Sequence, residues 1–210
     1  MRVFVVGGDN DYVNFIDNAE IVNTLEEAQL VVFTGGEDVT PSLYGCKKHS
    51  TTYNNPDRDK YEQEIFKRIN SNTQVVYGCC RGSQFVTVMN GGLLIQNVTT
   101  HALYHTHGIT NNERIYEITS THHQMMYPYN MKSSDYDILF TSYCTGFTKY
   151  EGDKIIQENM NEDTEPEIVL YHKEGNPKCL AVQGHPEMIP NSVVSKMINN
   201  LIQDLINEIN

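Results

Sequence analysis

The feature that most constrains the fold is an apolar strand that runs directly into a cysteine flanked by glycines. The strand pattern covers Gln74–Tyr77, the segment Gly-Cys-Cys-Arg-Gly-Ser-Gln follows as residues 78–84, and a helical pattern continues over Phe85–Met89. A strand that turns abruptly into a helix, with small residues on both sides of a nucleophile, is typical of a nucleophile elbow. The sequence therefore predicts a parallel-sheet enzyme with a cysteine at the end of one strand.

Within this segment the two cysteines are predicted to have different fates. Gly78 and Gly82 allow the backbone to reverse and the helix to approach the sheet closely, so that Cys80 sits in a tight turn with its sulfur exposed. The helix N-terminus beneath Cys80 favours the thiolate form. Cys79 has no such role in this geometry, and we expect it to point into the core.

A reactive cysteine needs a base, and a second motif near the far end of the sequence supplies one. An apolar strand ends in Gly184-His185-Pro186-Glu187. Pro186 stiffens the turn, and Glu187 is placed to hold the His185 imidazole in the correct tautomer. We therefore predict that Cys80, His185 and Glu187 act as nucleophile, base and orienting carboxylate.

A third motif predicts where a developing negative charge would be held. The apolar run Leu30–Phe33 leads into the pair Gly35–Gly36. Free backbone N–H groups at such a turn can face an oxyanion, and the N–H of Arg81 is the expected second donor. Three separate segments thus converge on one site for acyl transfer.

Apolar runs of strand length recur along the chain, and the early ones alternate with helical patterns. This alternation is typical of a parallel sheet covered by helices, so the fold class is α/β. The runs are Val3–Val6, Leu30–Phe33, Gln74–Tyr77, Asp137–Phe140, Ile168–Tyr171 and Cys179–Val182. The region from about residue 99 to 150 is less periodic, and we interpret it as short strands and loops on the functional edge of the sheet.

Two helices have clear limits in the sequence. One begins at Asn55-Pro56, where Asn caps and Pro takes the first helical position; its expected buried face is Tyr61, Ile65, Phe66 and Ile69. The other runs from about Asn191 to the end. Its apolar residues recur at helical spacing and are expected to pack in the core.

Length and charge argue against some classes of binding partner. The 210 residues are 39% hydrophobic and carry 15 Lys and Arg against 27 Asp and Glu, a formal net charge of −12. This length suits one domain over residues 1–210, and the negative charge argues against nucleic acid and anionic membranes as partners. The short apolar run before Gly7–Gly8 is too brief for a signal sequence or a membrane span, so we expect a cytoplasmic protein.

The other cysteines and histidines of the sequence do not predict a metal or cofactor site. The five cysteines (Cys46, Cys79, Cys80, Cys144 and Cys179) lack the spacing of a zinc ribbon or a disulfide framework. A histidine cluster (His101, His105, His107, His122 and His123) suggests a metal site, and His105 and His107 can share one strand face. No carboxylate or thiolate lies at a matching spacing, and cysteine acyl transfer needs no ion, so we expect none. The acidic stretch Glu158–Glu167 is expected to be an exposed loop.

These motifs together resemble a known superfamily. Residues 78–84 match the G-x-C-x-G-x-Q elbow of class I glutamine amidotransferases, and residues 184–187 match their H-P-E segment. The sequence is most similar to the γ-glutamyl hydrolase branch, peptidase C26, which includes γ-glutamyl-γ-aminobutyrate hydrolases. Three further matches carry that likeness: residues 35–45, Arg58-Asp59 with Glu62, and Ser120–Gln124. The resemblance spans about residues 30 to 190.

The resemblance implies a three-layer α/β/α sandwich with a mostly parallel sheet, similar to flavodoxin. It implies Cys80, His185 and Glu187 as the catalytic residues and an oxyanion site at Gly36 and Arg81. It also implies a glutamyl pocket around Gly35, Gln84 and the segment His122-His123-Gln124, with His123 and Gln124 as its binding residues. The implied activity is hydrolysis of γ-glutamyl amides, with glutamine or a γ-glutamyl amine or peptide as substrate.

Two alternatives stay open at this point. The first is a glutaminase that passes ammonia to a synthetase on a separate chain. The second is a binding module that has kept the fold without the activity.

Overall fold

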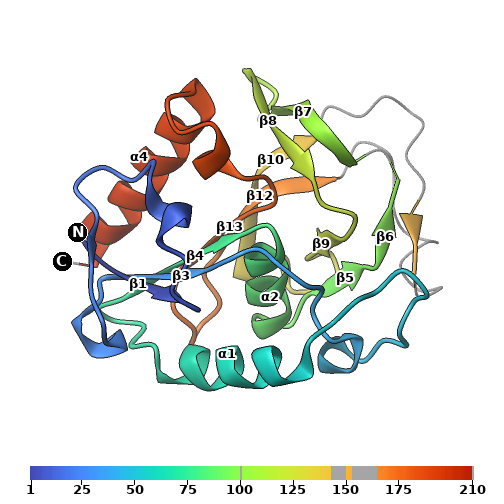
Figure 1. Cartoon of the computed structure of the whole chain (residues 1–210), viewed down its shortest axis with the longest axis horizontal. Coiled ribbons are helices and arrows are strands. Elements are labelled where there is room, and N and C mark those ends of the chain that lie inside the picture. The colour runs from blue at the N-terminus through green and yellow to red at the C-terminus, as the bar shows by residue number, and fades with distance from the viewer. Residues whose placement is uncertain (100, 143–149, 153–164, 210) are drawn as a thin grey trace.

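A nine-stranded sheet forms the centre of the computed structural model, which describes residues 1–99, 101–142, 150–152 and 165–209 (Figure 1). Within those residues the strand order is β2-β1-β3-β4-β13-β12-β10-β7-β8. The first five strands are parallel to one another, and every pairing from β13 onward is antiparallel. The fold is therefore α/β with a parallel core, as predicted.

The strands have the following bounds. The parallel half comprises β2 (Glu20–Ile21), β1 (Arg2–Val6), β3 (Leu30–Phe33), β4 (Val75–Cys79) and β13 (Cys179–Val182). The antiparallel half comprises β12 (Pro166–Tyr171), β10 (Tyr136–Ser142), β7 (Ala102–Thr110) and β8 (Ile115–Thr121). Strands β3, β4 and β13 are buried along their whole length, which matches their continuous apolar sequences.

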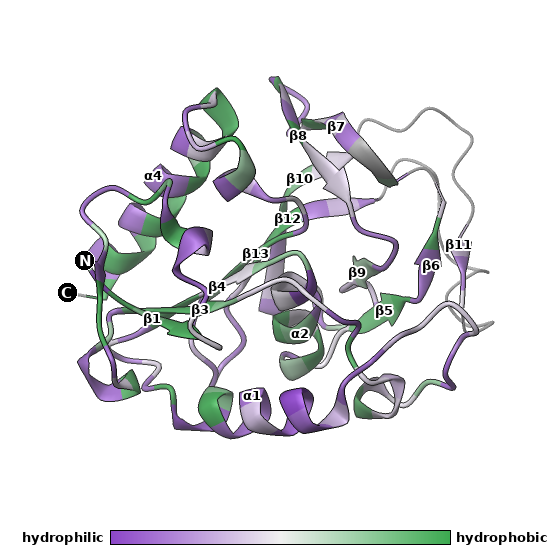
Figure 2. Cartoon of the chain, viewed as in Figure 1, coloured by the Kyte–Doolittle hydropathy of each residue, from purple (hydrophilic) through white to green (hydrophobic). Residues whose placement is uncertain are grey.

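Helices cover both faces of the sheet. Helices α1 (Pro56–Arg68) and α2 (Arg81–Met89) lie on one face, where Phe66 and Phe85 pack with Phe33 of β3. Helix α4 (Val193–Glu208) lies on the other face, where Ile198 and Ile202 join the core around β1 and β3. In Figure 2 the ribbon of α4 alternates between hydrophobic and hydrophilic colours, as expected for a helix with one buried side.

Local sequence explains where these helices begin. The Asn55 side chain accepts a hydrogen bond from the N–H of Arg58, and Pro56 takes the first helical position of α1, as predicted. The Ser192 side chain caps α4 in the same way by accepting from the N–H of Ser195. Each cap satisfies an N–H that the helix itself leaves without a partner.

Three details of the sequence prediction are wrong. Tyr61 of α1 is 50% exposed and Val193 of α4 is 71% exposed, because each lies on the solvent side of its helix. The predicted loop Glu158–Glu167 lies partly outside the described residues, and its end is not a loop. Pro166 begins β12, and both Glu165 and Glu167 are fully buried beside histidines. Cys144, one of the five cysteines, lies outside the described residues.

The region after α2 forms small strand pairs outside the nine-stranded sheet. Two small antiparallel pairs lie there: β5 (Leu93–Ile95) with β9 (Met125–Tyr127), and β6 (Asn97–Val98) with β11 (Tyr150–Glu151). The β7–β8 hairpin extends the sheet at the same side. Its strands of nine and seven residues are longer than the short strands predicted for this region. In the described ranges no helix has the length and apolar character needed to cross a bilayer.

Candidate active site

Cys80 lies at the turn between β4 and α2, in the backbone geometry predicted for a nucleophile elbow. Its φ of 52° and ψ of −112° are unusual for a residue other than glycine. Its N–H donates to the Val182 carbonyl at 2.8 Å, and its own carbonyl accepts from Ser83 at the start of α2. These bonds hold the strained residue in place and leave the Cys80 side chain partly exposed.

The two flanking glycines are required by close packing. A Cβ atom on Gly78 would lie 2.6 Å from the Gly82 carbonyl oxygen, and a Cβ on Gly82 would lie 2.0 Å from the Phe33 carbonyl oxygen. Both distances are far inside van der Waals contact. The elbow therefore depends on α2 pressing directly onto β4 and β3, as the sequence predicted.

His185 follows β13 and is held by two contacts. Its Nδ1 lies 2.5 Å from Glu187 Oε1, and its backbone N–H donates to the Thr119 hydroxyl at 2.6 Å. Burial lowers the pKa of His185, but hydrogen bonds with Cys79, Cys80 and Glu187 outweigh burial and raise the pKa above its ordinary value. Because Nδ1 faces Glu187, Nε2 is the nitrogen left for Cys80.

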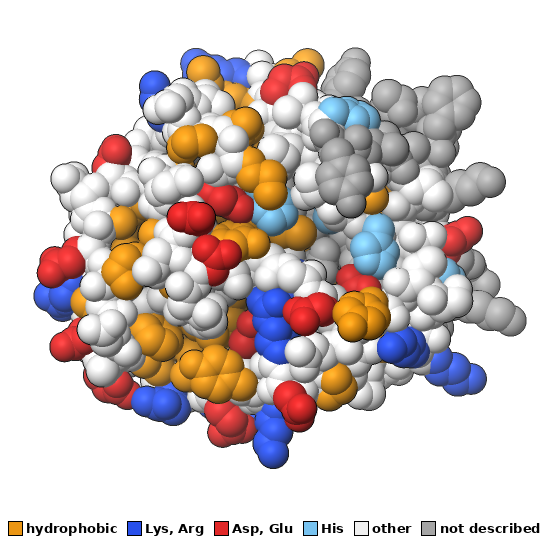
Figure 3. All heavy atoms as spheres, viewed as in Figure 1, with side chains coloured by type: hydrophobic (Ala, Val, Ile, Leu, Met, Phe, Trp, Pro, Cys, Tyr) orange, Lys and Arg blue, Asp and Glu red, His pale blue; other side chains and the backbone are white. Residues whose placement is uncertain are grey.

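Cys80 and His185 share one cleft although more than a hundred residues separate them in the sequence. A cavity of about 490 Å³ is lined by both residues and by Gly36, His105, Thr106, Thr119, Thr121 and Met188. A second cavity of about 220 Å³ also reaches Cys80. The sulfur therefore stands between two cavities. Histidine side chains, pale blue in Figure 3, are spread over the centre and right half of this face.

Cys79 is fully buried, as expected, but it is not remote from the site. Its Sγ lies 3.4 Å from the Gly184 carbonyl oxygen, 3.5 Å from Glu187 Oε2 and 3.8 Å from His185 Nδ1. Burial, together with the charge of Glu187, raises the pKa of the Cys79 thiol to about 12. Cys79 therefore contacts the histidine and carboxylate from the core side as a neutral thiol.

The predicted oxyanion donors lie beside the sulfur. Gly36 and Arg81 line the smaller cavity together with Cys80. Among the described residues, neither backbone N–H has a hydrogen-bond acceptor. Gly36 has a φ of +133°, and a Cβ there would lie 2.1 Å from the Arg58 guanidinium, so only glycine fits this turn. Two unpartnered N–H groups next to a cysteine can stabilise a developing negative charge.

The Arg58 side chain holds the turn at Gly35–Gly36 in place. Its guanidinium donates to the Gly35 carbonyl at 2.9 Å and to the Thr34 carbonyl at 3.1 Å, and it pairs with Glu37 at 3.0 Å. Its Nε donates to Glu62 at 2.8 Å. The turn that carries Gly36 is thus tied to helix α1.

A buried ion-pair network ties the elbow to the same helix. The Arg81 side chain, 2% exposed, pairs with Asp59 and with Glu62, and its Nε donates to the Glu37 carbonyl at 3.1 Å. Asp59 also accepts from the Thr40 N–H at 2.9 Å. In the sequence, Asp59 and Glu62 stood out only through the family resemblance, because residue spacing does not indicate that Arg81 is their partner.

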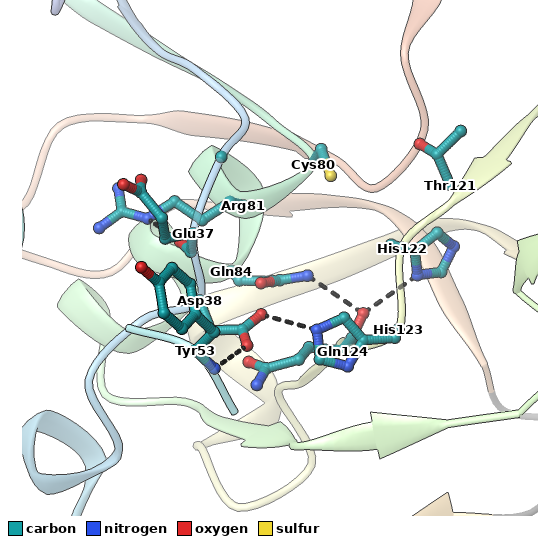
Figure 4. A pocket seen from close by; sticks show the side chains of 11 residues that line it. Glu37, Asp38, Tyr53, Cys80, Arg81, Gln84, Thr121, His122, His123 and Gln124 are labelled. Atoms are coloured by element: carbon teal, nitrogen blue, oxygen red, sulfur yellow. Dashed lines mark hydrogen bonds and ion pairs between the residues drawn. The ribbon is translucent and has the colours of Figure 1, made fainter. Parts of the chain in front are cut away.

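The smaller cavity has a polar wall from the segment after β8 (Figure 4). Gln84 Nε2 donates to the Gln124 carbonyl at 3.1 Å, so these two predicted residues lie together. His123 Nε2 lies 3.0 Å from Asp38 Oδ1. The hydrogen bond with Asp38 raises the pKa of His123, against the effect of burial.

Gly35 is placed differently from the other predicted pocket residues. It lines neither of these two cavities, and a Cβ atom there would lie 2.6 Å from the Tyr12 hydroxyl and 3.1 Å from Cε1 of His185. Four residues that were not assigned to the site from the sequence line the smaller cavity: Glu37, Asp38, Tyr53 and Thr121. Asp38 follows closely on the glycine pair and Thr121 precedes the two histidines, so proximity to those motifs was a usable signal.

Comparison with known proteins agrees with this geometry. The family model for Peptidase C26 matches residues 12–187. The YvdE homolog of Lactococcus lactis subsp. cremoris, a glutamine amidotransferase-like protein, is 35% identical over 114 residues, covering 51% of this chain and 57% of that protein. YvdE of Lactococcus lactis subsp. lactis (strain IL1403) is also 35% identical over 114 residues, covering 51% of this chain and 45% of that protein. The chain thus spans about half the length of these curated relatives.

A solved structure shares the fold over the whole chain. A glutamine amidotransferase from Thermotoga maritima superposes with a TM-score of 0.57 at 15% identity, covering 100% of this chain and 97% of that one. At this identity the likeness speaks for the fold alone.

Proposed function

Because the chain belongs to the peptidase C26 family, within the class I glutamine amidotransferase-like superfamily, we propose that it hydrolyses γ-glutamyl amide bonds through a thioester on Cys80. The observation that carries the proposal is the position of Cys80. Its strained backbone holds the sulfur at the junction of two cavities, one of which it shares with His185. A merely structural cysteine would have no need of this geometry.

The first half of the reaction forms the thioester. His185 takes the proton of Cys80, and the thiolate attacks the γ-carbonyl carbon, so that a C–S bond forms and the carbonyl oxygen becomes negative. The N–H groups of Gly36 and Arg81 are placed to stabilise that oxygen. His185 then gives its proton to the nitrogen as the C–N bond breaks, and the amine leaves.

The second half restores the enzyme. His185 removes a proton from water, the hydroxide attacks the thioester carbonyl, and the C–S bond breaks to release glutamate. The proton returns to the Cys80 sulfur through His185. Throughout, Glu187 holds the imidazole and stabilises its charged form.

The two cavities suit the two ends of a γ-glutamyl substrate. The smaller one offers amide, carboxylate and imidazole groups at Gln84, Asp38 and His123, which can bind the α-ammonium and α-carboxylate of the glutamyl group. The larger one, beyond Cys80 and His185, includes Thr106 and Met188 and has room for an amine leaving group. This division favours substituted γ-glutamyl amines or peptides.

The test compares two neighbouring cysteines. Turnover of a γ-glutamyl panel (glutamine, γ-glutamyl amines and γ-glutamyl dipeptides) is followed by mass spectrometry for wild type, Cys80→Ala and Cys79→Ala. We expect Cys80→Ala to abolish turnover and Cys79→Ala to keep most of it, with circular dichroism showing both variants folded. Undiminished hydrolysis by Cys80→Ala, or no hydrolysis of any panel member by wild type, refutes the proposal.

The names of the curated relatives support a second candidate, a glutaminase that delivers ammonia to a separate synthetase chain. The two candidates differ in the leaving group and in dependence on a partner. Strong glutamine turnover that occurs only with a partner chain would favour the glutaminase, whereas turnover of γ-glutamyl amines by the isolated chain would favour the hydrolase. Either reaction depends on a reduced thiol, which fits the cytosol.

A further inference from the structure

A second cluster of reactive side chains lies beside the proposed active site. Three histidine Nε2 atoms surround the carboxylate of Glu167, with His107 at 3.1 Å and both His101 and His122 at 3.7 Å from Oε1. One potential ligand atom from each of the four residues lies within 4.8 Å of the others. Glu167 is fully buried and His122 is 3% exposed.

The fold assembles this cluster from four separate positions. His101 precedes β7, His107 lies within β7, His122 follows β8, and Glu167 lies in β12. No metal was expected here from the sequence, because no carboxylate or thiolate stands at a matching spacing from these histidines, but β12 brings the carboxylate of Glu167 to them. The other two histidines do not take part: His105 lines the larger cavity, and His123 faces Asp38.

Hydrogen bonds on the far side of two rings set their tautomers. Nδ1 of His122 lies 3.0 Å from the Gln124 carbonyl oxygen, and Nδ1 of His101 lies 3.2 Å from the Thr99 carbonyl oxygen. A carbonyl only accepts, so each Nδ1 carries a proton, and the Nε2 of neutral His122 presents a lone pair to Glu167. Nε2 of His101 also lies 3.3 Å from Glu165 Oε2. A backbone carbonyl on the distal nitrogen is the usual way in which a metal-binding histidine is oriented.

The centre of the cluster lacks hydrogen-bond donors. Among the described residues, the two carboxylate oxygens of Glu167 and the Nε2 atoms of His107 and His122 have no hydrogen-bond partner of good geometry. With neutral rings, lone pairs of imidazole and carboxylate face one another, and burying a carboxylate in that way is costly unless a cation compensates. Adding one proton to the cluster would turn only one of these Nε2 atoms into a donor and would leave the other facing the carboxylate.

We propose that His101, His107, His122 and Glu167 form a binding site for a divalent metal ion, with Zn²⁺ as the preferred ion. Three imidazoles and one carboxylate make a four-coordinate nitrogen and oxygen set that suits Zn²⁺, and four protein ligands make a closed site. Ligand atoms around tetrahedral zinc lie roughly 3.3 Å apart, given bond lengths near 2.0–2.1 Å. The side chains therefore need to contract by at most about 1.5 Å at the widest pair.

A metal ion bound at this site would connect two parts of the fold. It would link the end of the β7–β8 hairpin to β12, and His122 is immediately followed by His123 and Gln124 in the wall of the smaller cavity. Binding of the metal would thus fix one wall of the pocket that we assign to the glutamyl group. The metal takes no part in the acyl-transfer steps.

Metal binding is measured directly on the whole chain. Protein stripped with a chelator is titrated with Zn²⁺ by calorimetry, its metal content is measured after dialysis, and Co²⁺ is used as a spectroscopic substitute. We expect about one Zn²⁺ per chain, a higher melting temperature with Zn²⁺, and a tetrahedral Co²⁺ spectrum without thiolate charge transfer. His107→Ala and Glu167→Gln are expected to weaken binding by at least ~100-fold, because each removes a ligand.

Two sets of control variants distinguish this cluster from the remaining histidines and cysteines. His172→Ala removes a histidine that pairs with Asp137 away from the cluster, and it should bind like wild type. Cys80→Ser and Cys79→Ser should also bind like wild type, since Cys79, His185 and Glu187 form the other group able to hold a metal among the described residues. No zinc uptake by wild type, equal uptake by the cluster variants, or a thiolate band in the Co²⁺ spectrum of wild type overturns the proposal. The last readout needs no variant, so it decides the question even where a substitution prevents folding.

Discussion

Nδ1 of His185 lies 2.5 Å from Oε1 of Glu187, and both side chains are at least nine-tenths buried. The bond sets the tautomer of the imidazole and directs Nε2 away from the carboxylate, toward the cleft that Cys80 lines. In this arrangement the carboxylate stabilises the charged imidazole more than the neutral one. The charge of Glu187 should therefore affect how the activity depends on pH.

Glu187→Gln keeps the shape of the side chain and removes its charge. We expect kcat to fall on the order of 10²- to 10⁴-fold, because an amide holds the imidazole without stabilising its positive charge. Hydrogen bonding to Glu187 helps to raise the pKa of His185, so the variant should have a lower pKa there. The imidazolium then loses its proton at a lower pH than in wild type, and because His185 acts as a base in its neutral form, the acidic limb of the kcat/KM profile should move to lower pH. An unchanged profile would contradict the role given to Glu187.

The two consecutive cysteines should differ in reactivity. Burial raises the pKa of the Cys79 thiol to about 12, so this thiol stays protonated throughout the range in which an ordinary cysteine ionises. Iodoacetamide should therefore modify Cys80 and leave Cys79 unmodified in the folded protein, as peptide mass spectrometry can show. In urea-unfolded protein both should react. Preferential labelling of Cys79 in the folded state would exchange the roles of the two residues.

Glu62 and Glu64 of helix α1 offer a matched pair for testing the buried network. Glu62 pairs with Arg58 and Arg81, and its side chain is 2% exposed. Among the described residues Glu64 forms an ion pair with Lys67 alone, at the surface, and its side chain is 63% exposed. Glu62→Gln should lower the free energy of unfolding by about 1–3 kcal/mol, since it weakens two charged hydrogen bonds while Arg81 keeps Asp59 and Arg58 keeps Glu37 as charged partners. Glu64→Gln should cause no measurable change. Urea denaturation of both variants makes the comparison, and equal stabilities would show that the network contributes little.

Gly82→Ala tests the contact between α2 and β3. The added methyl would lie 2.0 Å from the Phe33 carbonyl oxygen, and backbone on both sides prevents a small local adjustment. We expect a loss of roughly 3 kcal/mol or more in stability, at the upper end of the cost of overpacking. Gly152→Ala is the control, because its methyl would meet Gln96 only at 3.4 Å. Thermal unfolding of the two variants should differ clearly, and similar melting temperatures would show that α2 can shift away from β3.

Several parts of the fold could be predicted because their signals are local. The run Leu30–Phe33 became β3 and the run Cys179–Val182 became β13 with the same bounds, since continuous apolar residues specify a strand buried on both faces. The cap at Asn55 was equally local. The prediction was wrong at Tyr61, where helical spacing does not specify how far the buried face extends around α1.

The acidic segment shows the limit of composition as a guide to structure. A run of Glu and Asp is typical of a solvated loop, yet Glu167 lies in β12 and is fully buried. Its burial is compatible with folding only because His101, His107 and His122 arrive from other parts of the chain. Composition describes the chemical nature of a segment and not the neighbours that it acquires.

The sequence by itself determined the elements whose causes lie within a few residues: the turn at Cys80 with its glycines, the His185-Pro186-Glu187 segment, and the helix caps. Only the tertiary structure decided which of these lie together, and it also created the Arg81 network and the histidine cluster around Glu167. The physical reason is that bonding and steric preferences act over one or two turns of chain. Contacts between residues far apart in the chain depend instead on the order of strands in the sheet and on how the helices pack against it.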